Sequence, residues 1–76
     1  MLMEKIPNGT YRHFKGNLYQ VLGMARDSET LEEMVIYQAL YGERGIWVRP
    51  ARMWLEQVER DGKSQPRFQL VEERKE

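Results

Sequence analysis

The sequence has no cysteine and only one histidine, His13, among its 76 residues. Disulfides, thiolate metal sites and multi-histidine metal sites are therefore excluded, so the fold must be stabilised by packing, backbone pairing or self-association. No apolar run approaches the roughly 18 residues that a membrane-spanning helix needs. The first residues lack the basic and apolar segments of a signal peptide. We therefore expect a cytoplasmic protein that requires no cofactor and contacts no membrane.

An excess of charge of either sign is also missing, because twelve Lys and Arg residues balance twelve Asp and Glu residues. This balance disfavours strong nonspecific binding to nucleic acid. The chain is instead rich in aromatic residues, with four Tyr, two Trp and two Phe, and each buries a large area when packed. A chain of this length forms one domain. We expect residues 9–71 to form it, with residues 1–8 as a lead-in and residues 72–76 as a charged tail.

Short segments of β-type residues between turn residues predict a mostly-β domain. Gly23 predicts a bulge or bend. Pro50 ends one strand and favours a helical turn over residues 51–55. Five strands, tight hairpins and one short helical turn indicate a small five-stranded SH3-like barrel, in which closure covers the strand edges. The expected strands are residues 11–14, 18–25, 34–41, 46–49 and 67–71.

Residues 34–41 are ambiguous between strand and helix. Thr30 and Glu33 have the spacing of a helix capping box, and several residues around them are good helix formers. Against a helix, this stretch contains four β-type residues, and a loop with Gly42 and Gly45 joins it to the next strand as a hairpin. We therefore predict a strand, with a helix as the alternative. The β-type residues are Val35, Ile36, Tyr37 and Tyr41.

Three groups able to carry positive charge, Arg12, His13 and Lys15, lie close to a predicted hairpin turn. Strand alternation points Arg12 and His13 to opposite faces. The functional interpretation is an anion site for phosphate, carboxylate or a nucleic-acid backbone. The alternative is a solvated hairpin tip with the histidine ring packed against an aromatic neighbour. Catalysis by His13 is disfavoured, because neither Ser28 nor Ser64 lies in a nucleophile motif.

Trp47 and Arg49 share one face of their predicted strand, and Val48 lies on the other. If Val48 faces the core, Trp47 and Arg49 face outward, with Tyr37 of the paired strand beside them. Such a surface suits stacking of a base, a proline-rich peptide or a modified cation. The alternative is that Trp47 packs under the C-terminal segment and Arg49 pairs with a carboxylate such as Glu29 or Glu56.

A set of spaced motifs runs from about residue 9 to residue 58, with Arg67-Phe68 near its end. The residues are Gly9-Thr10-Tyr11-Arg12-His13-Phe14-Lys15-Gly16, Tyr19-x-Val21, Ala25, Glu29-Thr30, Val35-Ile36-Tyr37-Gln38-Ala39-Leu40-Tyr41-Gly42, Trp47-Val48-Arg49-Pro50 and Met53-Trp54. Together they resemble a family of small bacterial proteins known as domain of unknown function 1653. Trp54 departs from the family pattern, which has Phe there. The resemblance implies a mostly-β fold and a bacterial, cytoplasmic setting, and it brings no known activity or catalytic residue.

These observations favour a non-catalytic binding module whose partner is a protein, a peptide or nucleic acid. The candidate ligand-binding residues are Arg12, His13, Lys15, Tyr37, Trp47 and Arg49. A basic patch that includes Arg26 would favour RNA or a nucleotide, and a surface of mixed charge would favour a protein. One alternative is a homo-oligomeric assembly protein whose exposed Trp and Tyr are buried in a homodimer. A less favoured one is a small-molecule-binding enzyme accessory, which needs a pocket of roughly 300 Å³ or more.

Overall fold

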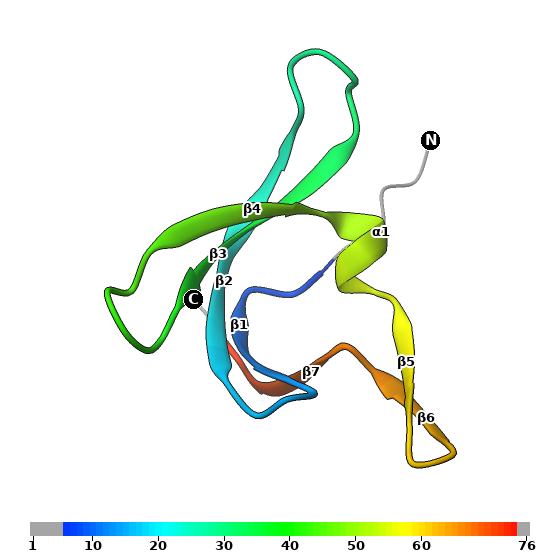
Figure 1. Cartoon of the computed structure of the whole chain (residues 1–76). Helices are drawn as coiled ribbons and strands as arrows, with labels where there is room; N and C mark the ends of the chain where they lie inside the picture. Colours follow the sequence, from blue (N-terminus) through cyan, green and yellow to red (C-terminus); the bar gives the residue numbers. More distant parts are fainter. Residues whose placement is uncertain (1–5, 75–76) are drawn as a thin grey trace.

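The computed structural model describes residues 6–74, which form seven strands and one short helix (Figure 1). The mostly-β prediction is confirmed, and residues 34–41 contain a strand rather than a helix. The helical turn after Pro50 is also confirmed. The elements are β1 (Gly9–His13), β2 (Leu18–Arg26), β3 (Glu33–Ala39), β4 (Ile46–Pro50), α1 (Ala51–Trp54), β5 (Gln57–Arg60), β6 (Lys63–Pro66) and β7 (Phe68–Glu73).

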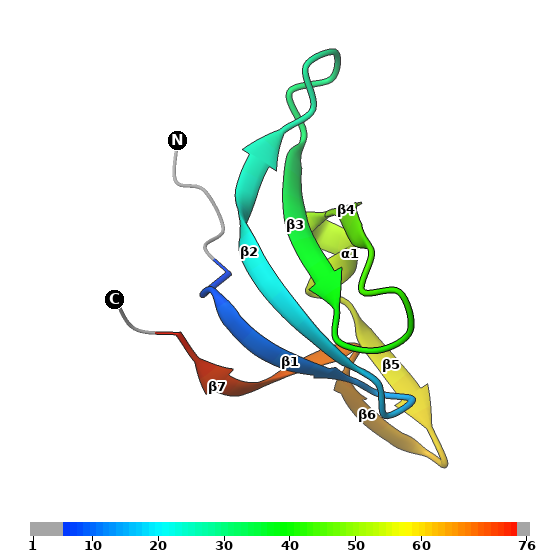
Figure 2. The same ribbon diagram turned by 90° about the vertical axis from the view of Figure 1, so that its left-hand side faces the viewer.

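Five of the strands form one antiparallel sheet in the order β4-β3-β2-β1-β7, and β5 and β6 form a separate two-stranded sheet. The larger sheet is twisted, and its strands curve around the core (Figure 2). Among residues 6–74, β4 and β7 each pair with one strand only, so both remain edges. The pairing therefore shows five strands in an open sheet rather than a closed barrel, because Pro50 ends β4 and α1 turns the chain away.

A bulge in β2 decides which of its side chains face the core. The pairing between β2 and β3 shifts register between Val21 and Gly23, so Leu22 is the extra residue. Val21 is fully buried before the bulge, and Met24 packs against the core after it. The bend predicted at Gly23 is therefore confirmed. Leu22 itself is exposed.

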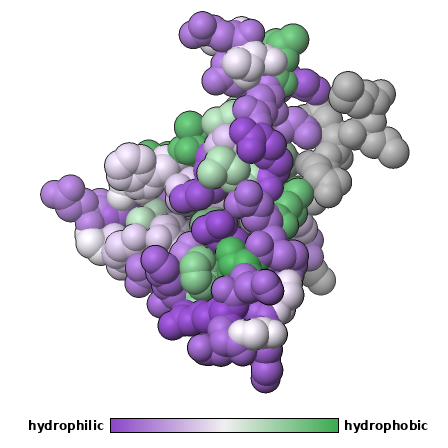
Figure 3. All heavy atoms as spheres, turned by 45° about the vertical axis from the view of Figure 1, so that its right-hand side comes forward, coloured by the Kyte–Doolittle hydropathy of each residue, from purple (hydrophilic) through white to green (hydrophobic). Residues whose placement is uncertain are grey.

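The core lies between the concave face of the five-stranded sheet and α1, whereas the molecular surface drawn in Figure 3 is mostly hydrophilic, with hydrophobic residues scattered over it. At the centre of the core the rings of Trp54 and Phe68 stack in parallel, with their centroids 3.7 Å apart. The edge of Tyr11 meets Trp54 at 5.4 Å, an arrangement that adds to the energy of area burial. Trp54 is 2% exposed, so it fills a packing position as predicted. The core residues are Ile6, Tyr11, Val21, Val35, Tyr37, Ala51, Trp54 and Phe68.

The faces of β4 are the reverse of the prediction. Val48, expected in the core, is 59% exposed. Trp47 lies opposite Tyr37 and Arg49 lies opposite Val35 in the register, so both share the concave face with these buried residues. Tyr37 is consequently a core residue and not part of an exposed platform. Alternation alone does not say which face is buried when both faces of a strand carry apolar residues.

Two further segments are more ordered than predicted. The polar residues 60–66 include a hairpin, in which Arg60 pairs with Lys63 across Asp61 and Gly62. Both turn residues have positive φ, 54° and 76°, which matches a two-residue type I′ turn. β7 runs to Glu73 and pairs with β1, so the strand enters the segment that we expected to be a tail.

Candidate functional site

A group of cations and aromatic rings lies at one end of the concave face, and we name it the cationic–aromatic face. Three features meet at this end of the molecule in Figure 2: the turn between β1 and β2, the loop between β3 and β4, and the hairpin β5–β6. The face therefore draws on segments that are distant in sequence. Its members are His13 from β1, Lys15 from the turn, Tyr19 from β2, Trp47 and Arg49 from β4, and Arg67 from the link between β6 and β7.

His13 is packed among aromatic rings. Its ring centroid lies 4.5 Å from that of Phe14, and its edge-on contact with Phe68 is at 4.9 Å. The backbone N–H of Lys15 donates to His13 Nδ1 at 3.2 Å, so the neutral ring carries its proton on Nε2. The ring therefore packs against aromatic neighbours, which is one part of the alternative described from the sequence.

The charges that shift the pKa of His13 are all positive. Burial lowers the pKa of His13 below its ordinary value of 6.5, and the nearby Arg67, Arg49 and Lys15 lower it further. A like-charged neighbour disfavours the imidazolium form, so the ring is held neutral at neutral pH. The same three cations would attract any anion that reached the His13 ring.

Arg49 is held at the face without a carboxylate. Its guanidinium lies 5.6 Å from the ring centroid of Phe68, which is the distance of a cation–π contact. Among residues 6–74 it forms no ion pair, and its buried Nε atom has no hydrogen-bond partner. The expected alternative of a pair with Glu56 is wrong, because Glu56 binds Arg67 instead.

Arg67 belongs to the face, although the sequence did not indicate it. Its Nη2 lies 3.2 Å from an oxygen of Glu56, and its guanidinium lies 5.8 Å from the centroid of Phe14. Its backbone is fixed on both sides: the N–H donates to the carbonyl of Glu56, and the carbonyl accepts from the N–H of Phe14, each at 2.9 Å. No local motif signals this residue, because its position depends on backbone bonds to distant segments.

Aromatic rings complete the rim of the face. The hydroxyls of Tyr19 and Tyr41 lie 2.9 Å apart. Burial and the bond to Tyr41 raise the pKa of Tyr19 to about 12. Tyr41 and Trp47 are 47% and 61% exposed, so their rings remain available to a ligand. Trp47 is one of the ligand-binding residues predicted from the sequence, and Tyr19 and Tyr41 are not.

Two cations that the sequence analysis grouped with this site lie elsewhere. Arg12 is exposed and follows buried Tyr11 on β1, so it points to the outer face of the sheet. Arg26 is at the far end of β2, where its guanidinium donates to the carbonyl of Leu31 at 3.4 Å. The structure thus brings together His13, Lys15, Trp47 and Arg49, and separates them from these two arginines.

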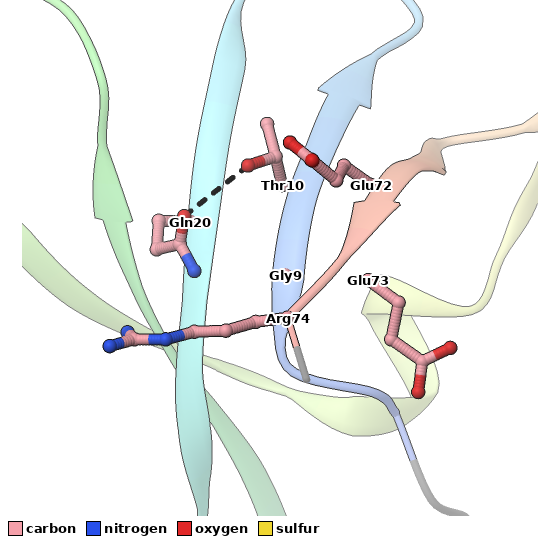
Figure 4. A pocket seen from close by; sticks show the side chains of 6 residues that line it. All are labelled: Gly9, Thr10, Gln20, Glu72, Glu73 and Arg74. Atoms are coloured by element: carbon pink, nitrogen blue, oxygen red, sulfur yellow. Dashed lines mark hydrogen bonds between the residues drawn. The ribbon is translucent and has the colours of Figure 1, made fainter. Parts of the chain in front are cut away.

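Two hollows lie away from the cationic–aromatic face. One of about 340 Å³ lies beside β1 and the end of β7, and in Figure 4 the carboxylates of Glu72 and Glu73 point in different directions. A hydrogen bond there joins Thr10 Oγ1 to Gln20 Oε1 at 3.3 Å. The other, of about 260 Å³, adjoins α1. Their lining residues are Gly9, Thr10, Gln20, Glu72, Glu73 and Arg74 for the first, and Glu32, Glu33, Ala51, Arg52 and Leu55 for the second.

Residues 6–74 contain no cluster of three or more His, Asp or Glu side chains placed to hold a metal ion. No helix in the same range is long and apolar enough to cross a membrane.

Comparison with known proteins gives two matches that agree. A family described as "Protein of unknown function (DUF1653)" matches residues 9–70. The crystal structure of a protein belonging to DUF1653 from Bordetella bronchiseptica is 39% identical to this chain, with a TM-score of 0.85, and the match covers 99% of each chain. No curated protein matches. The resemblance found from the sequence motifs is therefore confirmed, and neither match brings a ligand.

Proposed function

This chain belongs to the DUF1653 family, whose description assigns no activity, so we propose its function from the site: a non-catalytic binding module for an anionic ligand. The observation that carries the proposal is the absence of a carboxylate partner for Arg49 among residues 6–74. The Arg49 guanidinium, which lies near His13 together with Arg67 and Lys15, would donate a charge-assisted hydrogen bond to a bound anion through its terminal N–H groups.

The exposed rings favour single-stranded nucleic acid among the anionic ligands. Trp47 and Tyr41 offer ring faces on which bases can stack, while Arg49, Arg67 and Lys15 would meet phosphates. Stacking rings next to cations are the usual combination in proteins that bind single strands. The three cations near His13 support this ligand.

A catalytic role has less support than binding. His13 holds its proton on Nε2 and is neutral, so it suits acid–base chemistry in principle. The serines lie elsewhere: Ser28 is exposed in the loop after β2, and Ser64 bonds to Gln57 on the hairpin. Neither provides a nucleophile beside the imidazole.

The strand order supports our proposal that the fold is related to SH3-like barrels. The sheet order β4-β3-β2-β1-β7, with a helical turn after β4, is compatible with such a barrel in which β5–β6 is an inserted hairpin. Small domains of this kind commonly act by binding, although fold alone does not establish function. A bacterial, cytoplasmic setting stays a prediction from the sequence.

The test is a ¹⁵N NMR titration with single-stranded oligothymidine and, separately, oligouridine. We expect saturable shifts at His13, Lys15, Trp47 and Arg49, together with quenching of Trp47 fluorescence. With two or three phosphates contacted, affinity should fall with a log–log salt slope of about −1.4 to −2.1. Saturable shifts with an acidic peptide but none with either oligonucleotide would keep the anion site and overturn the nucleic-acid ligand.

A matched pair of variants separates the site from general charge. Arg49→Met and Arg12→Met remove the same charge and keep an apolar stem. However, Arg49 lies on the concave face and Arg12 points to the outer face. We expect roughly tenfold weaker binding for Arg49→Met, the loss of about one charge-assisted hydrogen bond, and little change for Arg12→Met. Equal losses would refute the proposed site.

A further inference from the structure

The edge strand β4 exposes a run of apolar residues. Ile46, Trp47 and Val48 are 61%, 61% and 59% exposed. Within the described chain, β4 pairs with β3 only, so its second side is open. Proteins usually protect such edges with charged residues, proline or bulges, because an open apolar edge pairs readily with another strand. Three consecutive apolar residues without a charge therefore need a partner.

The hydrogen-bonding groups of this edge can be assigned residue by residue. The carbonyl of Gly45 accepts a bond from the N–H of Ala39 at 3.0 Å. Backbone N–H and C=O groups alternate in direction along a strand, so those of Trp47 and Arg49, like the carbonyl of Gly45, point toward β3. The N–H and C=O groups of Ile46 and Val48 then point away from the sheet and are open to a second strand.

We propose that β4 pairs antiparallel with β4 of a second copy of this chain, with a two-fold axis at Trp47. In this register Ile46 of each copy lies opposite Val48 of the other. Both residues direct their backbone groups outward, so the two strands exchange four hydrogen bonds. On the outer face, the side chain of Ile46 in each copy packs against that of Val48 in the other. The inference goes beyond the ligand-binding function and does not depend on it.

Neighbouring registers are less favourable. A pairing centred on Val48 would place Ile46 opposite Pro50, which has no N–H to donate at that hydrogen-bonded position. A pairing centred on Ile46 would bring Val48 opposite Arg44, where φ is 57° and the extended strand conformation is lost. The register centred on Trp47 avoids both defects.

The side chains on the concave face also fit this register. The two Trp47 residues lie opposite one another at a non-hydrogen-bonded position, where facing Cα atoms are only about 4.5 Å apart. Arg49 comes opposite Gly45 of the other copy, so no like charges oppose each other. A Cβ added to Gly45 would lie 3.1 Å from Trp47 Nε1, so the indole covers this glycine. Arg49 of the second copy would therefore meet an aromatic ring.

The acidic edge of the sheet lies away from this pairing. β7 ends in Glu72 and Glu73, on the opposite side of the sheet from β4. The paired residues Ile46, Trp47 and Val48 carry no charge, and Arg49 lies opposite Gly45. Within the register, therefore, no like charges oppose each other.

The test compares Val48→Pro with Val48→Ala by sedimentation over a wide range of protein concentration. Proline is tolerated on an edge strand where its missing N–H would have faced outward, so Val48→Pro should fold and lose only the bond to the second copy. Val48→Ala keeps that N–H. We expect wild type to reach twice 9.1 kDa and Val48→Ala to dimerise at higher concentration. Val48→Pro should stay monomeric, with circular dichroism confirming its fold.

Amide hydrogen exchange of the unmodified chain provides a second measurement if Val48→Pro does not fold. Dimerisation should slow exchange at Ile46 and Val48 as the concentration rises. The amides of Trp47 and Arg49, which already bond to β3, should not change. Three results would overturn the proposal: a wild type that stays monomeric, a folded Val48→Pro that dimerises as strongly as wild type, or open-ended assembly from pairing between β4 and β7.

Discussion

Replacing Phe68 tests whether the stacked pair with Trp54 is the centre of the core. Phe68 is 6% exposed, its ring stacks on Trp54 at 3.7 Å, and it meets the edges of His13 and Tyr19 at 4.9 and 5.6 Å. Phe→Leu retains most of the apolar volume, which limits the packing loss to about 1 kcal/mol. It also removes an aromatic pair that contributes roughly 0.5–1.5 kcal/mol. We therefore expect Phe68→Leu to destabilise the fold by about 2 kcal/mol.

This loss is large for so small a domain. A chain of 76 residues is expected to have a free energy of unfolding of roughly 4–11 kcal/mol. A loss of about 2 kcal/mol lowers the melting temperature by about 8–16 °C at this size. Phe68→Ala should cost about 3–5 kcal/mol, which would leave the protein unfolded if the stability of the parent is at the low end of the range. The leucine variant is therefore the informative one.

Urea denaturation followed by far-ultraviolet circular dichroism measures the effect. The matched control is Val71→Ala on the same strand, where the side chain is 48% exposed and the expected change is below about 0.5 kcal/mol. A Phe68→Leu variant within 0.5 kcal/mol of wild type, or one no less stable than Val71→Ala, would refute the central role of the stacked pair.

Three other predictions concern the backbone and the titrating groups. Gly9→Ala should lower the free energy of unfolding by roughly 2–4 kcal/mol, because φ is 153° and a Cβ would lie 2.3 Å from the carbonyl oxygen of Glu72. An unchanged midpoint in thermal or urea unfolding would contradict this. His13 should titrate below pH 6.5 by NMR, and stability should fall as pH drops from 6.5 through its lowered pKa, because the unfolded chain binds the proton more readily. A bound phosphate anion should raise that pKa, and a pKa above 6.5 in the free protein would disprove the cationic surroundings. Burial and the charge of Glu73 raise the pKa of Tyr11 to about 12. Tyr11 should therefore stay protonated at pH 11 in an ultraviolet titration of the folded protein. Ionisation near its ordinary pKa of 10 would contradict its burial.

The strands were predictable because their signals are local. Val35 and its β-type neighbours outweighed the capping-box spacing of Thr30 and Glu33, and the structure confirms a strand there. Gly23 marked a real bulge, and Pro50 marked the end of β4. Each of these features depends on the conformational preferences of a few adjacent residues.

The orientation of β4 was not predictable in the same way. Ile46, Trp47 and Val48 are all apolar, so alternation placed Trp47 and Arg49 on one face without saying that this face is the concave one. The pairing with β3 decides it, because the buried Val35 and Tyr37 lie opposite Arg49 and Trp47. The expectation for Val48 was wrong for this reason.

The candidate site was predictable only in part. His13 and Lys15 lie close together in the sequence, so their shared position was predictable. Strand alternation places Arg12 on the opposite face from His13. Arg67 reaches the site through backbone bonds to Glu56 and Phe14, contacts that no local pattern contains. Single-sequence reasoning thus recovers the groups that one strand presents and misses those that the tertiary fold adds.

The hairpin β5–β6 offers a practical attachment point for labels. Its strands belong to no larger sheet, and its base is closed by the hydrogen bond from Arg67 N–H to the carbonyl of Glu56 at 2.9 Å. Lengthening a loop whose ends are already held together has a small entropic cost, and exposed turn tips tolerate insertion well. A lanthanide-binding or fluorescent peptide inserted between Asp61 and Gly62 would therefore report on ligands at the nearby face while the core stays intact.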